Sequence, residues 1–214
     1  MKTTMAACLL SSVVVLLAAL SIWSDRRGRW TLVYVFRPLS LLVLIFLAGV
    51  AATPETAFYK YEIVAGLAFS LLGDIFMMLR QKKFTAGLAS FLAAQLFYVA
   101  AFWSGIHRPL LFWPLLPLIF YALLIGFKLI PRSGRMKIPV LIYVSAIIAM
   151  AWLAGERYLQ LQGGKAFFAL AGAILFVVSD SVLAYNRFVR PLRWAQVLIL
   201  GTYFPAQLLI ALSV

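Results

Sequence analysis

The sequence predicts an all-α, polytopic integral membrane protein with about eight transmembrane helices. Hydrophobic residues make up 65% of the 214 residues, only 12% are charged, and the mean hydropathy is +1.02. Apolar stretches of the roughly 20 residues that a spanning helix needs recur along the whole chain. They leave no room for a soluble domain, so we expect a single transmembrane domain over residues 1–214, with any ligand site among the helices.

Charged or turn-forming residues separate the eight expected spans. The first span is interpreted as a retained helix rather than a signal peptide, because Arg26, Arg27 and Arg29 follow it and no small-residue cleavage pattern stands out. Short segments rich in charge, Gly or Pro end the others. The expected spans are 5–23, 34–52, 62–79, 84–103, 110–129, 137–155, 166–185 and 193–213.

The 19 Lys and Arg residues are shared unevenly between the two sides. Most of them lie in or beside every second loop, starting with the first. Basic loops stay in the cytoplasm, so we expect both termini outside and the chain in the bacterial inner membrane. The net charge of +13 is then mainly a topology signal, which favours contact with lipid head groups over nucleic acid as a partner. The opposite side holds only Lys2, Lys60, Arg108, Arg157 and Lys165.

One cysteine, Cys8, and one histidine, His107, limit the chemistry available to the chain. A single cysteine excludes a disulfide within the chain. Zinc sites usually combine several His or Cys ligands, so we expect no metal centre of that kind.

Two segments of the sequence resemble each other and predict a parallel internal repeat of four helices plus four. Residues 66–74 read GLAFSLLGD and residues 172–180 read GAILFVVSD, so that Gly precedes Asp by eight positions in both. A small residue, Gly73 or Ser179, stands directly before each aspartate. Further along, an aromatic residue follows a basic loop residue in both segments, Phe84 and Phe188, and the next helix carries a Gln and a Tyr on one face: Gln95 with Tyr98, and Tyr203 with Gln207.

The two aspartates, Asp74 and Asp180, are the main candidates for a functional site. They are the only acidic residues inside the expected spans, where a carboxylate costs about 2.5–3.5 kcal/mol and usually faces the bundle interior. Each precedes a basic loop residue, Arg80 or Arg187, by six or seven positions, which places it roughly 10 Å inside the cytoplasmic boundary. A shared functional site explains two matched aspartates better than structural pairing across helices does.

Polar residues near the aspartates predict a cavity for a substrate. Gln and Tyr also serve as hydrogen-bonding contacts between membrane helices, so that interpretation stays open. Arg80 and Arg187 are candidates to bind a lipid phosphate, although they also act as topology determinants. The residues expected to contact substrate inside the membrane are Ser70, Gln95, Tyr98, Ser179, Tyr203 and Gln207.

A family resemblance rests on residues 66–74, 84–91 (FTAGLASF), 172–184 and 202–207 (TYFPAQ). In these segments, and over nearly the whole chain, the sequence resembles the YhhN family, whose vertebrate relatives are the lysoplasmalogenases. The resemblance implies hydrolysis of the vinyl ether bond of lysoplasmalogens to a fatty aldehyde and a glycerophospho-base, with lysophospholipid and water as substrates and no cofactor. Gln95 departs from the family pattern, which often has His there, and this argues against an obligatory histidine.

Two carboxyl groups suit that reaction. Vinyl ether hydrolysis needs an acid that protonates the β-carbon, negative charge near the oxocarbenium ion, and a base that activates water, as in glycoside hydrolysis. The vinyl ether lies at the junction of glycerol and hydrocarbon, which is the depth expected for Asp74 and Asp180. We expect one aspartate to protonate carbon and the other to activate water, and the sequence leaves their order open.

Other functions stay open from the sequence. A proton-coupled transporter of a small molecule or lipid would use Asp74 and Asp180 as proton sites. An intramembrane aspartyl protease is suggested weakly by residues 72–74 and 204–207, although the order of its motifs differs here. A lipid-binding or scaffold protein would use the aspartates only for structure. Head-group preference and oligomeric state are not encoded in any motif.

Overall fold

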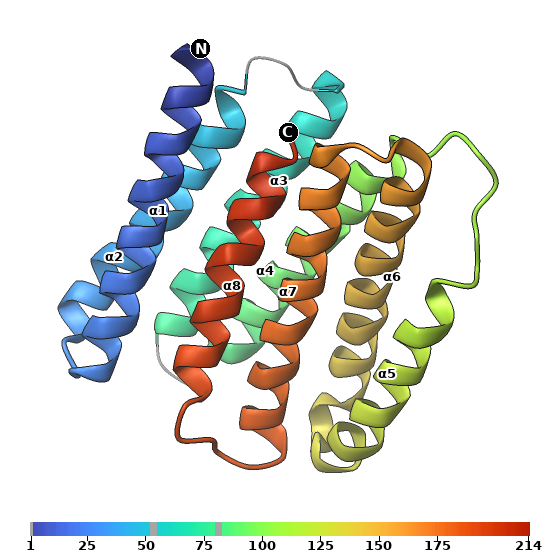
Figure 1. Cartoon of the computed structure of the whole chain (residues 1–214). Coiled ribbons are helices and arrows are strands. Elements are labelled where there is room, and N and C mark those ends of the chain that lie inside the picture. The colour runs from blue at the N-terminus through green and yellow to red at the C-terminus, as the bar shows by residue number, and fades with distance from the viewer. Residues whose placement is uncertain (1, 52–54, 80–82) are drawn as a thin grey trace.

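The computed structural model describes residues 2–51, 55–79 and 83–214, and it confirms the all-helical membrane fold (Figure 1). In these ranges eight helices are long and apolar enough to cross a membrane. Two short 3₁₀ turns, η2 (Ile130–Arg132) and η3 (Gly134–Met136), connect the fifth helix to the sixth. The helices are α1 (Lys2–Arg26), α2 (Trp30–Gly49), α3 (Ala57–Met78), α4 (Phe84–Trp103), α5 (Leu115–Leu129), α6 (Lys137–Leu161), α7 (Gly164–Phe188) and α8 (Ala195–Leu212).

The helices form one bundle in which chain neighbours pack in pairs. The closest pairs are α3 with α4, α7 with α8, and α1 with α2, while α4 and α7 both pack on α6. Helix α8 also contacts α1, α2 and α3, so it closes the bundle from the other side. Helix α5 lies at the edge against α6 and α7 (Figure 1).

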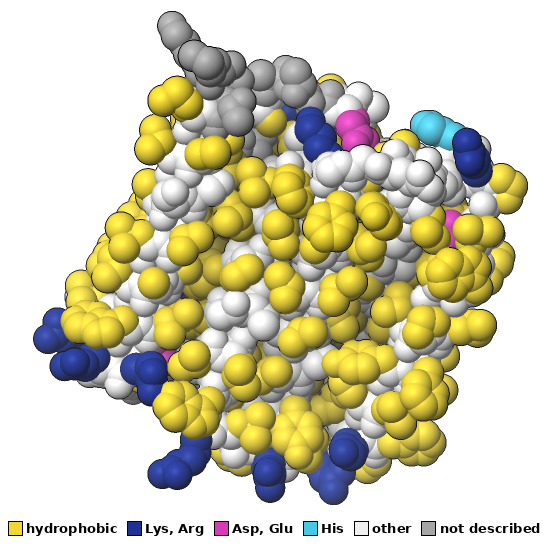
Figure 2. All heavy atoms as spheres, viewed as in Figure 1, with side chains coloured by type: hydrophobic (Ala, Val, Ile, Leu, Met, Phe, Trp, Pro, Cys, Tyr) yellow, Lys and Arg dark blue, Asp and Glu magenta, His cyan; other side chains and the backbone are white. Residues whose placement is uncertain are grey.

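The two ends of the bundle differ in charge. Figure 2 shows Lys and Arg side chains gathered at the end opposite the two termini, with hydrophobic side chains covering the band between the ends. This is the arrangement that the uneven basic loops predict, because spanning helices alternate in direction and bring every second loop to the same end.

Local chemistry sets several helix ends. The Thr56 hydroxyl accepts a hydrogen bond from the backbone nitrogen of Tyr59 at 3.0 Å and so caps the start of α3. Helix α6 ends at Leu161, because the following residue, Gln162, has a φ of 49° and turns the chain into the left-handed region. Helix α5 begins at Leu115 rather than at the expected 110, because the rings of Pro109 and Pro114 prevent a continuous helix through this segment.

Two glycines allow helices to approach closely in the core. A Cβ atom on Gly66 would lie 2.3 Å from the Tyr98 ring, and one on Gly172 would lie 2.8 Å from the carbonyl oxygen of Ala206. Gly66 therefore stands where α3 meets α4, and Gly172 stands where α7 meets α8. They are also the glycines that precede the two aspartates by eight positions, while the internal repeat itself stays a prediction.

Helix α6 is longer than the sequence predicted. The expected span ended at 155, but α6 continues to Leu161 and encloses Glu156 and Arg157, which are 0% and 1% exposed. The expectation that Asp74 and Asp180 are the only acidic residues inside spans was therefore wrong. Both charged residues lie at the end of the bundle that holds the termini, and each is buried there because a neighbouring group pairs with it.

The two buried charges of α6 each have partners. Arg157 forms a salt bridge with Glu55, and its guanidinium lies 4.1 Å from the centre of the Tyr59 ring. The Glu156 carboxylate accepts a hydrogen bond from the backbone nitrogen of Leu111 at 3.0 Å. Paired in this way, two charges stay inside a helix that hydropathy alone would end earlier.

Candidate active site

Asp180 lies on α7 and accepts hydrogen bonds from two neighbouring helices. The Gln95 side-chain nitrogen on α4 donates to Asp180 Oδ2 at 3.1 Å, and the Tyr143 hydroxyl on α6 donates to the same oxygen. Both donors are neutral. Among the described residues none donates to Asp180 Oδ1, so this oxygen stands free for a further ligand or a proton.

A cavity of about 60 Å³ lies beside Asp180. Asp180, Tyr143 and Ser181 contribute its polar groups, together with Tyr121 of α5, whose hydroxyl donates to the Ser181 hydroxyl at 2.8 Å. The other lining residues are apolar side chains of α4, α5, α6 and α7. An apolar chamber with a carboxyl group in its wall suits a substrate whose reacting part is hydrocarbon-like.

Asp74 on α3 has different surroundings. It is 4% exposed, and the Arg37 guanidinium of α2, itself 6% exposed, lies within electrostatic range of its carboxylate. The Tyr203 hydroxyl of α8 faces the same carboxylate without the geometry of a hydrogen bond. Asp74 Oδ2, Tyr203 Oη and Arg37 Nε are therefore buried without a hydrogen-bond partner in the described part of the chain.

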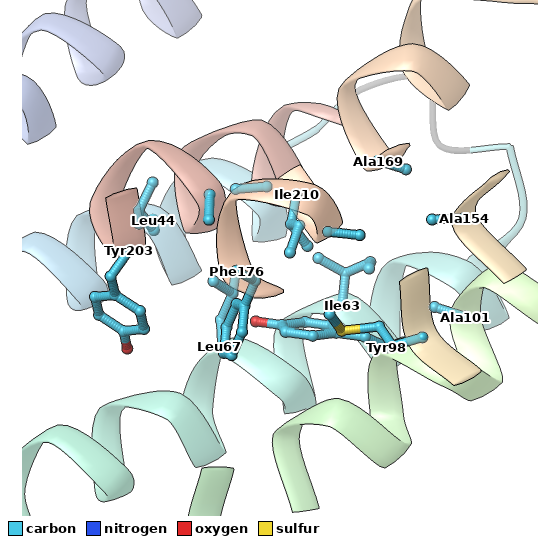
Figure 3. Packing of buried hydrophobic residues seen from close by; sticks show 14 of the residues in the cluster. Leu44, Ile63, Leu67, Tyr98, Ala101, Ala154, Ala169, Phe176, Tyr203 and Ile210 are labelled. Carbon is cyan, nitrogen blue, oxygen red and sulfur yellow. The ribbon is translucent and has the colours of Figure 1, made fainter. Parts of the chain in front are cut away.

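Tyr203 lies near Asp74 and also near a residue that is hydrogen-bonded to Asp180. Besides Asp74, it lies within electrostatic range of Tyr98 and of Tyr143, the donor to Asp180. Its ring packs edge-on against Phe91 at 5.9 Å and against Phe176 at 5.8 Å between ring centres, and Figure 3 shows it with Phe176 among the buried core residues. Each carboxyl group thus has a tyrosine close to it, and no continuous chain of hydrogen bonds joins the two in the described part of the chain.

Three of the residues expected to contact substrate are hydrogen-bonded to one another, and their contact with substrate stays a prediction. The Tyr98 hydroxyl donates to Gln207 Oε1 at 2.6 Å, and Gln207 Nε2 donates to the Ser70 hydroxyl at 2.9 Å. All three are fully buried and join α4, α8 and α3. Ser179 points elsewhere, because its hydroxyl donates to the carbonyl of Ile199 on α8 at 3.1 Å.

Of the two basic candidates, Arg187 lies at the end of the bundle away from the termini. Arg187 is exposed, and its guanidinium lies 4.7 Å from the centre of the Phe84 ring. Phe84 in turn packs edge-on against Phe188 at 6.1 Å, and both phenylalanines line the Asp180 cavity. The other basic candidate, Arg80, lies outside the described residues.

Sequence reasoning missed Tyr143 as a contact of Asp180. It lies on α6, which has no part in the matched motifs, and one tyrosine in an apolar span carries no signal of its own. Arg37 had a signal, because a basic residue inside an apolar span needs a partner. In the described ranges there is no group of three or more His, Cys, Asp or Glu side chains that could hold a metal ion.

Comparison with known proteins gives one family. The model of the YhhN family matches residues 32–214. The "Uncharacterized membrane protein YhhN" of Escherichia coli O157:H7 is 31% identical over 204 residues, which cover 94% of this chain and 95% of that protein. No solved structure matches the chain.

Relatives from mammals have a named activity. The bovine protein named "Lysoplasmalogenase TMEM86A" is 37% identical over 158 residues, covering 71% of this chain and 64% of that protein. The human protein named "Lysoplasmalogenase TMEM86B" is 36% identical over 155 residues, covering 72% and 64%. The matched part is thus a little under two thirds of each mammalian protein.

Proposed function

The chain belongs to the YhhN family, and on this premise we propose that it is a membrane-embedded hydrolase that cleaves the vinyl ether bond of lysoplasmalogens. Relatives named lysoplasmalogenase support a lysoplasmalogenase-like function in the family. One observation carries the proposal for this chain. Each aspartate has a tyrosine close to it, these two tyrosines lie within electrostatic range of each other, and one of the aspartates lies in the wall of an apolar cavity.

Asp180 is the proton donor to carbon in this proposal. It lines the cavity, and its Oδ2 already accepts two hydrogen bonds, so Oδ1 is the oxygen that carries the proton. The proton passes to the β-carbon of the vinyl ether, whose π electrons form the new C–H bond. The positive charge then rests on the neighbouring carbon and the ether oxygen, as in an oxocarbenium ion.

Asp74 is the second carboxyl group. Water attacks the cationic carbon, and its proton leaves through the Tyr203 hydroxyl to Asp74. The resulting hemiacetal releases the glycerol oxygen as an alcohol and becomes the aldehyde. The proton returns from Asp74 to Asp180 through Tyr203 and Tyr143, which lie between the two carboxyl groups, so that each turnover consumes one water and restores both aspartates.

The substrate is a lysophospholipid with its phosphate at the basic end of the bundle. Arg187 stacks on the ring of Phe84, which lines the cavity together with Phe188. Arg187 and Asp180 are seven residues apart on α7, which is a separation of roughly 10 Å along the helix axis. That separation suits a lipid whose phosphate and vinyl ether lie on either side of a glycerol unit.

Aldehyde release tests the proposal. Purified protein in detergent is given lysoplasmenylethanolamine, with the 1-acyl lysolipid as the control substrate and the Asp74→Asn/Asp180→Asn double variant as the blank. We expect aldehyde from the vinyl ether alone. If monodisperse protein releases none, the hydrolase proposal is wrong, and proton-driven uptake into proteoliposomes becomes the assay to run for a transporter.

The location of the site in the cell is a further part of the proposal. We place the chain in the inner membrane with the basic loops and both aspartates toward the cytoplasm and both termini outside. An alkaline phosphatase fused after Val214 is then expected to be active, and a fluorescent protein fused there to stay dark. The reverse pair of results would invert the topology.

A further inference from the structure

A second hollow lies beside the Asp180 cavity, between α5 and α6. Its volume is about 490 Å³, and its lining is apolar except for the hydroxyl of Ser145. Exposed side chains such as Leu123, Phe127 and Leu141 form its rim. We call this hollow the α5–α6 groove.

The groove and the Asp180 cavity share one wall. Five apolar residues line both of them: Ala122, Leu129, Val140, Val144 and Ile148. On the inner side of this wall stand Asp180 and Tyr143, and on the outer side lies the face that the protein presents to lipid. The groove is therefore the part of the lipid-facing surface that adjoins the reactive carboxyl group.

Helix α5 is the least buried of the spanning helices. Only 6% of its span is buried, against 50% for the span of α6. Its polar contact with the rest of the bundle is the bond from Tyr121 to Ser181 of α7. Because loosely packed segments open at low free-energy cost, the α5–α6 seam is the place where a lipid would enter sideways from the bilayer.

We propose that the α5–α6 groove holds the hydrocarbon chain of a single-chain lipid whose reacting bond lies at Asp180. This rests on the proposed function, and it names the part of the protein that selects the substrate's chain. The groove begins near Ile130 and Pro131, at the basic end where α7 also ends, and runs toward the middle of the bundle. A lipid whose phosphate lies at the basic end then has its hydrocarbon chain in the α5–α6 groove.

Gly126 gives the groove a position that a substitution can fill. It lines the groove, and a Cβ atom there would meet only the Ile130 side chain, at 3.4 Å. A leucine at 126 would therefore project into the groove and leave the packed core untouched. Gly201 on α8 is the matched control, because it is an exposed helical glycine with nothing within 4 Å of an added Cβ.

Photocrosslinking tests the groove without relying on catalysis. The probe is a 1-O-alkyl lysophosphoethanolamine with a diazirine in its chain, which lacks the vinyl bond and cannot be hydrolysed by the proposed reaction. In wild-type protein we expect labelled residues on α5 and α6. In Gly126→Leu this labelling should fall about tenfold, the effect of a misfit in an apolar pocket, while Gly201→Leu keeps it. Ser145→Leu fills the groove from α6 and should repeat the loss.

The outcomes separate this inference from the proposed function. Labelling spread evenly over all lipid-facing helices, or labelling unchanged in Gly126→Leu and Ser145→Leu, would overturn the groove assignment even if aldehyde is released. Labelling confined to α5 and α6 and lost in both variants would support it even if no vinyl ether is cleaved. With active protein, Gly126→Leu should also shift aldehyde release toward shorter chains.

Discussion

The two aspartates occupy matched sequence motifs, yet the bundle gives them different surroundings. Asp180 adjoins a cavity and accepts bonds from two neutral donors, Gln95 and Tyr143. Asp74 is nearly enclosed, faces Tyr203, and has the positive charge of Arg37 nearby. A carboxyl group between neutral donors at a cavity suits contact with substrate, whereas an enclosed one near a cation suits a group that accepts a proton. Similar sequence motifs are therefore placed in unlike surroundings by the packing of the bundle.

The largest effects on activity are expected when either carboxyl group is replaced. Asp180→Asn and Asp74→Asn are each expected to lower kcat by about 10²–10⁴-fold, because each removes one of the two groups that move protons. Initial rates of aldehyde release at saturating substrate measure the effect. Near-wild-type activity in either well-folded variant would remove that aspartate from the mechanism.

Substitutions of Arg37 test whether the positive charge near Asp74 matters for activity. Arg37→Met should lower kcat about tenfold to hundredfold, since the nearby charge that favours a negative Asp74 is lost, while Arg37→Lys should restore most of the activity. Kinetics of both variants measure the effect. Arg157→Met is the control at the other end of the bundle, where loss of the partner of Glu55 should lower the melting temperature but leave kcat of the folded protein unchanged.

The two tyrosines test the link between the carboxyl groups. Tyr143→Phe removes a donor to Asp180, and Tyr203→Phe removes the hydroxyl that faces Asp74. Each is expected to reduce kcat about tenfold: Tyr143→Phe loses a hydrogen bond that the structure shows, and Tyr203→Phe loses the hydroxyl proposed to pass the proton of water to Asp74. If each tyrosine acts only on its own carboxyl group, the double variant will show the product of the two effects. A relay through both predicts that the second substitution adds little.

The smallest effect on activity is expected for polar residues whose hydrogen bonds only join helices to one another. Tyr98→Phe and Gln207→Leu break the bonds between α4, α8 and α3. A double-mutant cycle on thermal or denaturant unfolding should give a coupling of about 0.6 kcal/mol, the average for bonds between membrane helices. Activity per folded protein should change less than threefold (about 0.6 kcal/mol). A hundredfold loss would instead make Tyr98 and Gln207 part of the catalytic network.

Part of the candidate site could be predicted from the sequence alone. Asp74 and Asp180 stand out because charge inside an apolar span is costly and rare. Gln95 and Tyr203 were expected near them, and both are neighbours of an aspartate in the bundle. Ser179 bonds to the backbone of α8, and its expected contact with substrate stays a prediction, because a serine carries no sequence signal that separates an interhelical bond from a binding contact.

The sequence by itself determined the eight spans and the two buried carboxyl groups. Each span satisfies its own backbone hydrogen bonds within a helix, so hydropathy along the chain is enough to find it. Only the tertiary structure decided what each carboxyl group meets. Tyr143 reaches Asp180 from α6, Arg37 approaches Asp74 from α2, and Arg157 finds Glu55 across the bundle. These contacts join helices far apart in the chain, and they depend on packing between spans, which no local pattern encodes.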